Sequence, residues 1–140
     1  MTMPAGQYYI GDLCYVMHDV WNEVCDLLYP DDTVGRGVEG EFTLKDGRKF
    51  ALYNTNYGDG QYDTSVWGET ICVDSGTIGC ILTSDIRDNT YTPEHIKEMA
   101  LIQTFSHDFN TSYEFDEYAD DDGYNVSEKI LNFGGIQVYT

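Results

Sequence analysis

The stretch Tyr57–Leu82, YGDGQYDTSVWGETICVDSGTIGCIL, decides the fold of this chain. Two runs within it, Thr70–Asp74 (TICVD) and Thr77–Leu82 (TIGCIL), are rich in β-branched residues and bounded by turn residues. This pattern predicts two buried strands joined at Ser75-Gly76. The glycines around them permit backbone angles that a side chain would forbid, so we look first for a site at these turns.

Upstream of this stretch the sequence predicts strands and a helix. Tyr8–Ile10 and Leu13–Met17 are short β-prone runs. Apolar residues then recur at helical spacing, which predicts a helix over residues 19–29 with Asp19 as its N-cap. The run Pro30-Asp31-Asp32 is expected to end this helix.

A hairpin and a second helix are predicted on either side of the central stretch. Asp46-Gly47 separates the β-prone runs Glu41–Leu44 and Arg48–Asn54, which is a strong hairpin signal. Thr92-Pro93 is a typical helix start, and the apolar spacing extends that helix over residues 93–105.

The last third of the chain is acidic and aromatic. Phe109, Tyr113, Phe115 and Tyr118 are expected to form an edge strand, with a loop over Ala119–Tyr124 and two short strands around Gly134-Gly135. The segregated strands and helices favour an α+β fold: one domain over residues 1–140, mainly antiparallel sheet with two helices. The predicted core comprises Trp21, Val24, Leu28, Phe42, Leu44, Phe50, Leu52, Ile71, Val73, Ile78, Ile81 and Ile102.

Charge is the strongest global feature of the sequence. The 25 acidic and 7 basic residues give a formal net charge of −18, so nucleic-acid phosphates and anionic membranes should repel the protein. A basic protein surface or a cation should attract it, and the charge also favours solubility. No apolar run is long enough to span a bilayer and the N-terminus has no secretory features, so we expect a cytosolic setting.

The four cysteines give no metal or disulfide pattern. Cys14, Cys25, Cys72 and Cys80 lie far apart and are expected to be reduced. Cys14 and His18 would need His95 or His107 to complete a zinc site. The run Asp120–Asp122 with Gly123 does not fit a calcium-binding loop, because the first and last positions of such a loop would lack an acid. We therefore expect no metal and no cofactor.

Three pieces of the chain carry a resemblance: Gly11–Val16 (GDLCYV), Tyr57–Tyr62 (YGDGQY) and Val73–Cys80 (VDSGTIGC). Over roughly residues 8–86 the chain resembles a group of small acidic proteins from tailed, T-even-like bacteriophages. The resemblance implies an infected bacterial cytoplasm and a role in host takeover or counter-defence. It implies no catalytic residue.

Three functions from different classes are compatible with these residues. In the first, a non-enzymatic inhibitor docks on the basic surface of a host protein, without binding nucleic acid or membrane, and its carboxylates imitate nucleic-acid phosphates. The residues of this acidic, tyrosine-rich surface are Glu114, Asp116, Glu117, Tyr118, Asp120, Asp121, Asp122 and Tyr124.

In the second, the glycine-rich turns hold an anionic small molecule such as a nucleotide on backbone N–H groups, which makes the protein a ligand trap. The residues of this site are Tyr57, Asp59, Tyr62, Asp74, Ser75 and Thr77. In the third, Asp74 in Val73–Thr77 (VDSGT) is the catalytic aspartate of a homodimeric aspartic-protease-like enzyme. The sequence does not determine the oligomeric state.

Overall fold

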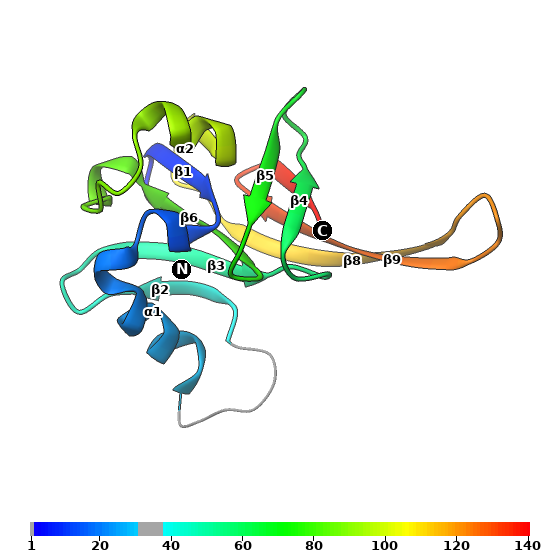
Figure 1. Ribbon diagram of the computed structural model, residues 1–140, viewed down its shortest axis with the longest axis horizontal. Helices are drawn as coiled ribbons and strands as arrows, with labels where there is room; N and C mark the ends of the chain where they lie inside the picture. Colours follow the sequence, from blue (N-terminus) through cyan, green and yellow to red (C-terminus); the bar gives the residue numbers. More distant parts are fainter. Residues whose placement is uncertain (1, 31–37) are drawn as a thin grey trace.

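Strand β6 (Thr77–Leu82) lies at the centre of the main sheet and is buried along almost its whole length. The computed structural model, which describes residues 2–30 and 38–140, places it in a five-stranded antiparallel sheet of order β2-β3-β6-β1-β7 (Figure 1). The other strands of this sheet are β1 (Gly6–Gly11), β2 (Gly40–Thr43), β3 (Lys49–Asn54) and β7 (Leu101–Phe105).

Two smaller antiparallel sheets complete the strands of the described chain. One has the order β10-β9-β8 and the other is the pair β4-β5. Their strands are β4 (Gly60–Asp63), β5 (Thr70–Val73), β8 (Thr111–Ala119), β9 (Asn125–Phe133) and β10 (Ile136–Tyr139). The helices are α1 (Trp21–Leu28) and α2 (Pro93–Met99), with 3-10 turns at Leu13–Tyr15, His18–Val20 and Thr83–Asp85.

The main sheet separates two hydrophobic cores. Tyr8, Ile10 and Ile78 face a core that includes Leu131, Phe133 and Val138 of the three-stranded sheet. Tyr9, Phe50 and Ile81 face the other core, which includes Val24 and Leu28 of α1. The alternation of side chains along β1, β3 and β6 therefore gives each face of the sheet its own apolar partner.

A close approach of strands explains one glycine in the central stretch. Gly79 lies opposite Leu52 of β3 and Gly11 of β1. A Cβ atom on Gly79 would lie 2.1 Å from the carbonyl oxygen of Ala51, so no other residue fits without moving the backbone of β3. This glycine is required by packing, since its φ is not positive.

The structure confirms the α+β class and most of the predicted elements. The hairpin at Asp46-Gly47, the strands on both sides of Ser75-Gly76, the edge strand β8 and the β9–β10 hairpin are all present. Phe109 is not part of the edge strand: β8 begins at Thr111, and Phe109 forms an isolated bridge with Met3. Thr92 caps α2 by accepting a hydrogen bond from the His95 N–H at 3.2 Å. Of the predicted core, Trp21, Phe42 and Ile102 are only partly buried and the other nine residues are buried.

The second helix is shorter than predicted. It ends at Met99, Ala100 is extended, and residues 101–105 form β7, which pairs with β1. Pairing with an available strand overrides the helical spacing in this short apolar run. Residues 60–63, for which the sequence predicted no strand, similarly form β4 by pairing with β5.

Two predictions near the N-terminus are wrong, because the side chains of Asp12 and Asp19 form contacts that the sequence did not show. Leu13–Tyr15 forms a 3-10 turn instead of a strand, because the Asp12 side chain accepts a hydrogen bond from the Cys14 N–H and turns the chain. Asp19 is not the cap of α1: its carboxylate pairs with Arg48, and α1 begins after Val20 without a side-chain cap. The predicted helix stop at Asp31-Asp32 lies outside the described residues.

Candidate functional site

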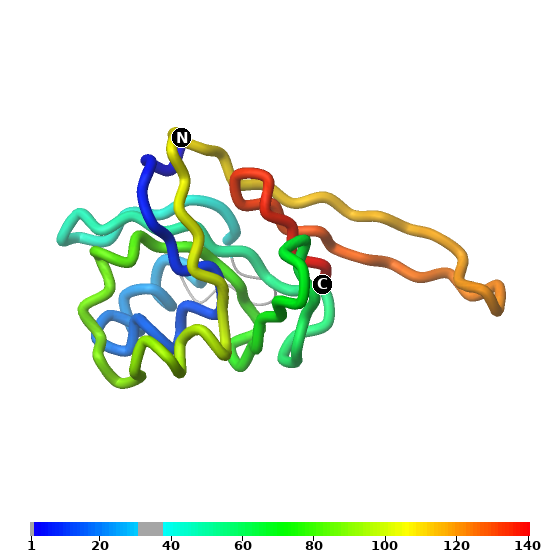
Figure 2. Tube along the Cα trace, turned by 90° about the horizontal axis from the view of Figure 1, so that it is seen from above, coloured from blue at the N-terminus to red at the C-terminus, as the bar shows by residue number. Residues whose placement is uncertain are grey.

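The β8–β9 hairpin extends beyond the body of the protein as an arm. We define the arm as residues 113–128; Figures 1 and 2 show it projecting away from the rest of the fold. Its tip is an ordered turn in which the Asp120 carboxylate accepts hydrogen bonds from the N–H groups of Asp122 and Tyr124 at 3.0 and 2.9 Å. The arm is therefore a defined hairpin up to its end.

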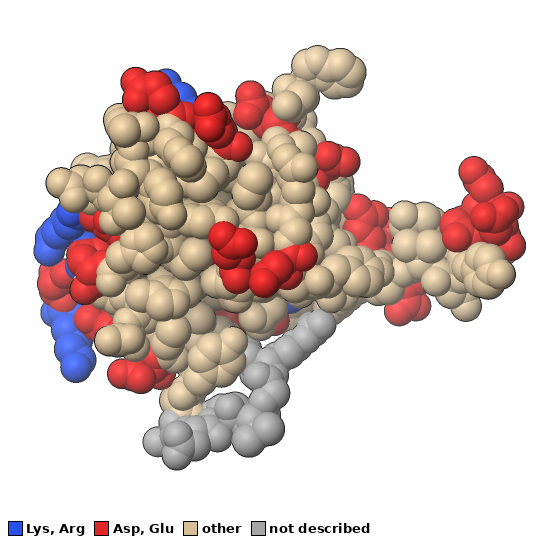
Figure 3. Space-filling view, in the orientation of Figure 1, with Lys and Arg blue, Asp and Glu red and all other residues tan. Residues whose placement is uncertain are grey.

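The arm carries a dense negative charge. Its sequence contains seven acidic residues and no Lys or Arg. In Figure 3 the acidic side chains cluster at its end, while most of the basic side chains visible in that view lie on the side of the body away from it. The β8–β9 register also places Asp116 directly opposite Glu128, so two like charges face each other across the strands. This pair is unfavourable for folding.

Four aromatic side chains of the arm are exposed to solvent. The exposed fractions are 42% for Tyr113, 51% for Phe115, 48% for Tyr118 and 72% for Tyr124. Aromatic residues flanked by charges are typical of the energetic centres of protein interfaces. The residues predicted for the acidic surface therefore lie together on one projecting hairpin, with Tyr113 beside them, and the structure adds Phe115 and Glu128.

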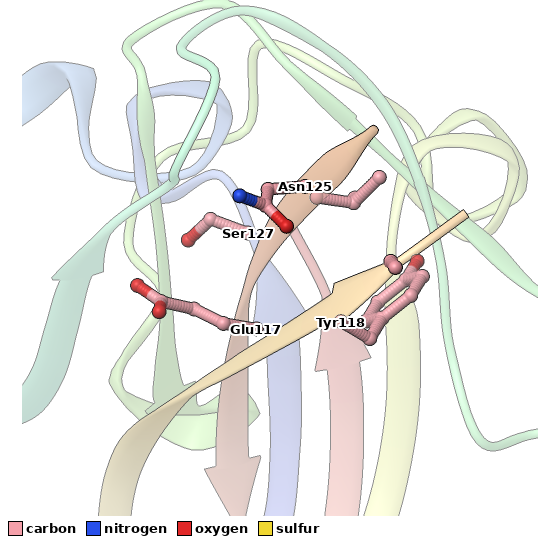
Figure 4. A pocket seen from close by; sticks show the side chains of 6 residues that line it. Glu117, Tyr118, Asn125 and Ser127 are labelled. Atoms are coloured by element: carbon pink, nitrogen blue, oxygen red, sulfur yellow. The ribbon is translucent and has the colours of Figure 1, made fainter. Parts of the chain in front are cut away.

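A shallow hollow of about 530 Å³ lies on the arm near its tip. It is lined by Glu117, Tyr118, Ala119, Asn125, Val126 and Ser127. Figure 4 shows the Glu117 and Ser127 side chains on one side of the hairpin and the Tyr118 ring on the other. The hollow is open and formed by surface side chains, so it suits a protein contact better than an enclosed ligand.

A buried lysine fixes the base of the arm. Lys129 is 0% exposed, forms an ion pair with Glu39, and lies 4.4 Å from the centre of the Tyr113 ring. The Tyr57 hydroxyl and the Asn56 side-chain amide both donate hydrogen bonds to the Ser127 carbonyl oxygen, at 2.5 and 3.0 Å. The Lys129 ammonium group is therefore paired inside the protein and does not neutralise the exposed acids of the arm.

The turn at Asp74-Ser75 is closed by a carboxylate from within the chain. Asp12 is fully buried and accepts hydrogen bonds from the N–H groups of Asp74 and Ser75, at 2.8 and 2.7 Å, and from the Ser75 hydroxyl at 2.8 Å. The Cys14 N–H donates a fourth bond at 2.9 Å. Asp12 therefore occupies the backbone N–H groups that an anionic ligand would need at this turn.

Most of the remaining residues of the predicted ligand site form hydrogen bonds within the protein. The Thr77 hydroxyl lies 2.6 Å from that of Ser75, and the Tyr62 hydroxyl donates to the Gly58 carbonyl oxygen at 2.8 Å. Asp59 is exposed, and the Tyr57 hydroxyl points to the base of the arm. These contacts show a structural role for Tyr57, Tyr62, Ser75 and Thr77.

Asp74, the candidate catalytic residue, is exposed and accepts a hydrogen bond from the Tyr15 hydroxyl at 2.5 Å. Burial and this carboxylate raise the pKa of Tyr15 well above its usual value. Burial and the Asp12 carboxylate likewise raise the pKa of the Cys14 thiol, so Cys14 is not a ready nucleophile. The Asp74 carboxyl group thus lies in a region where the Tyr15 hydroxyl and the Cys14 thiol stay protonated.

We also looked at the described residues for metal ligands, disulfides and membrane-spanning helices. No group of three or more His, Cys, Asp or Glu side chains there is arranged to hold a metal ion. All four cysteines are free thiols. Within residues 2–30 and 38–140 no helix has the length and apolar character needed to cross a membrane.

The chain finds no match among protein-family models, curated proteins or solved structures. The residues that organise the two candidate regions, Asp12 and Lys129, are ones that the sequence did not single out. Their sequence signals are weak, because Asp12 follows a glycine as in many turns and Lys129 is an ordinary charge in a polar stretch. Only the tertiary structure shows that both are fully buried.

Proposed function

We propose that this protein is a binding protein whose arm docks on a basic surface of another protein. In the setting that the phage resemblance implies, the partner is a host protein and the complex blocks it. The observation that carries the proposal is the arm itself: a hairpin that projects from the body with four exposed aromatic rings and seven acids.

The charge density of the arm favours imitation of a single nucleic-acid strand. Strand β8 has nine residues, which at about 3.3 Å per residue gives a length of roughly 30 Å. The arm has about this length, and its seven acids are distributed over β8, the turn and β9. The arm as a whole therefore carries one charge per about 4 Å of its length, whereas one strand of DNA carries one per about 3.4 Å and a duplex one per about 1.7 Å. The carboxylates thus take the place of phosphates.

The exposed rings extend the imitation from charge to shape. Proteins that bind single strands combine a basic groove with aromatic side chains on which bases stack. Tyr113, Phe115, Tyr118 and Tyr124 offer flat aromatic faces to such side chains. The proposed partner is therefore a protein whose basic groove accommodates single-stranded nucleic acid.

The other two functions receive less support from the geometry. A ligand trap at the Asp74-Ser75 turn would compete with Asp12 for the same N–H groups. A homodimeric protease would need Asp74 to share a proton with the same residue of a second subunit, and in this structure Asp74 already accepts a hydrogen bond from the Tyr15 hydroxyl.

The test uses capture of proteins from a bacterial lysate with three forms of the protein. The first is the natural chain, and the second replaces Glu114, Asp116, Glu117, Asp120, Asp121 and Asp122 with Gln or Asn. The third makes the same replacements at six exposed acids of the body, Asp26, Asp59, Asp63, Glu69, Glu94 and Glu98. Asn at position 120 keeps an acceptor for the turn.

The natural chain and the body variant should capture the same basic protein, and the arm variant should lose it. High salt and a single-stranded oligonucleotide should release it, and a duplex of equal length should be less effective. Equal loss from both variants would show that only net charge acts. Equal capture by all three forms would disprove the proposed role of the arm.

A further inference from the structure

The arm ends the three-stranded sheet with an uncovered edge. Strand β8 is the outer strand of the order β10-β9-β8, so one of its sides has no strand partner in the described chain. Eight of its nine residues are exposed. Long exposed edges of this kind can accept another strand, because their backbone groups retain hydrogen-bonding capacity.

The register shows which backbone groups point to the free edge. Lys129 and Thr140 exchange both backbone hydrogen bonds, at 2.9 Å each, so the odd-numbered residues of β9 bond to β10. Phe115 pairs with Lys129, and its N–H and C=O must therefore point away from β9. The same holds for Tyr113 and Glu117, which pair with other odd-numbered residues of β9.

The two faces beside this edge differ in chemistry. Glu114, Asp116 and Tyr118 lie on one face, together with Glu128 across the hairpin. Tyr113, Phe115 and Glu117 lie on the other. An added strand would therefore place basic side chains beside Glu114 and Asp116, and apolar side chains beside Tyr113 and Phe115.

Charge decides which strand the edge accepts. A second copy of this chain would bring its own β8 acids against those of the first, and like charges on neighbouring strands are destabilising. A strand that carries Lys or Arg would instead relieve the repulsion between Asp116 and Glu128. The edge is thus closed to self-association and open to a basic segment.

We propose that the free edge of β8 binds an extended segment of the partner as an added strand, in which basic and apolar residues alternate. This inference rests on the proposed docking role of the arm and gives its mode. The segment gains main-chain hydrogen bonds to Tyr113, Phe115 and Glu117, and alternating contacts set its specificity. The added strand also turns the outer part of the arm from two strands into three.

The test uses a ten-residue peptide of alternating Lys and Val as the probe. Two analogues carry N-methyl groups, one on every Lys and the other on every Val. In an added strand, alternate residues direct their N–H groups to β8, so one analogue loses these bonds and the other keeps them. We expect one analogue to bind at least about tenfold more weakly than the parent, and the other to bind like it.

Amide hydrogen exchange of the protein gives the second readout. The peptide should slow exchange at Tyr113, Phe115 and Glu117, whose N–H groups face the edge, more than at Glu114 and Asp116, which are already bonded to β9. Equal binding by both analogues, with no slowing at the three edge amides, would overturn strand addition. That result would leave charge-driven docking intact, because docking is tested separately by comparing the arm variant with the body variant.

Discussion

Asp12 and Ser75 lie 63 positions apart in the chain and are joined by two hydrogen bonds, from the Ser75 N–H at 2.7 Å and from its hydroxyl at 2.8 Å. Together with the Asp74 N–H, these bonds fix the turn between β5 and β6 to the end of β1. The motifs at residues 11–16 and 73–80 are therefore one structural unit. A buried carboxylate at its centre is satisfied by four donors, which makes its burial tolerable.

Replacing Asp12 should cost more stability than replacing Asp74. Asp12→Asn puts a donor amide where two backbone N–H groups and a hydroxyl need acceptors, and the site is fully buried. We expect a loss of about 3 kcal/mol in the free energy of unfolding, measured by urea denaturation. Asp74→Asn is the matched control, because Asp74 is exposed and should cost at most about 1 kcal/mol. Similar losses from both variants would contradict this account.

Arg48 should contribute substantially to the stability of the fold. Its side chain is 3% exposed and pairs with Asp46 at 2.9 Å and with Asp19 at 3.2 Å, which links the β2–β3 hairpin to the turn before α1. Arg48→Met keeps the apolar contacts but removes the partner of two carboxylates whose side chains are only 34% and 37% exposed, so we expect a loss of about 2 kcal/mol in the free energy of unfolding, measured by urea denaturation. Lys45→Met, at an exposed position of the same hairpin, should change stability by less than about 0.5 kcal/mol.

Lowering the pH should remove the contribution that Asp88 makes to the free energy of unfolding. Burial opposes the shift, but hydrogen bonds from Thr90 and from the His18 N–H, together with the nearby His18 ring, lower the pKa of Asp88 in the folded protein. Because this pKa lies below the unfolded value of about 3.9, the contribution is complete above pH 4 and is lost as the pH falls through the folded pKa.

The measurement compares the natural chain with Asp88→Asn by urea denaturation between pH 7 and pH 2.5. The natural chain should be more stable at pH 7, and the difference between the two should shrink as the pH falls below about 4. The comparison removes the background change in repulsion among the other acids. Asp63→Asn, at an exposed position, is the control for the change in net charge. A constant difference for Asp88→Asn would contradict the assigned pKa shift.

Local signals were enough to predict most elements, and tertiary contacts explain the failures. Turn residues at Asp46-Gly47 and Ser75-Gly76 and the cap at Thr92 act within a few residues, so the sequence shows them directly. The strand at residues 101–105 depends on pairing with β1, almost a hundred positions away, and no local pattern distinguishes it from a longer helix.

The residues of the candidate site could be predicted from the sequence, but their arrangement on a projecting hairpin could not. The acids and tyrosines between residues 114 and 124 are visible in the sequence as a charged aromatic segment. That they lie on a projecting hairpin depends on the pairing of β8 with β9 along nine residues and on Lys129 at its base. The role of the Asp74-Ser75 turn also required the structure, because its hydrogen-bond acceptor comes from residue 12.

Reversing one charge of the arm should stabilise the fold and weaken binding at once. Asp116→Lys replaces a repulsive pair with an attractive one across from Glu128, which should add about 0.5 kcal/mol to the free energy of unfolding measured in urea. Glu114→Lys changes net charge by the same amount, but position 114 faces Ile130 and meets Glu128 only on the diagonal, so its gain should be smaller. Association with a basic partner, followed at low salt, should slow to a similar extent in both variants. If Asp116→Lys destabilised the protein, the Asp116–Glu128 pair would not be unfavourable for folding, which would contradict this account. If neither variant slowed association, the acids of β8 would have no part in steering the partner to the arm.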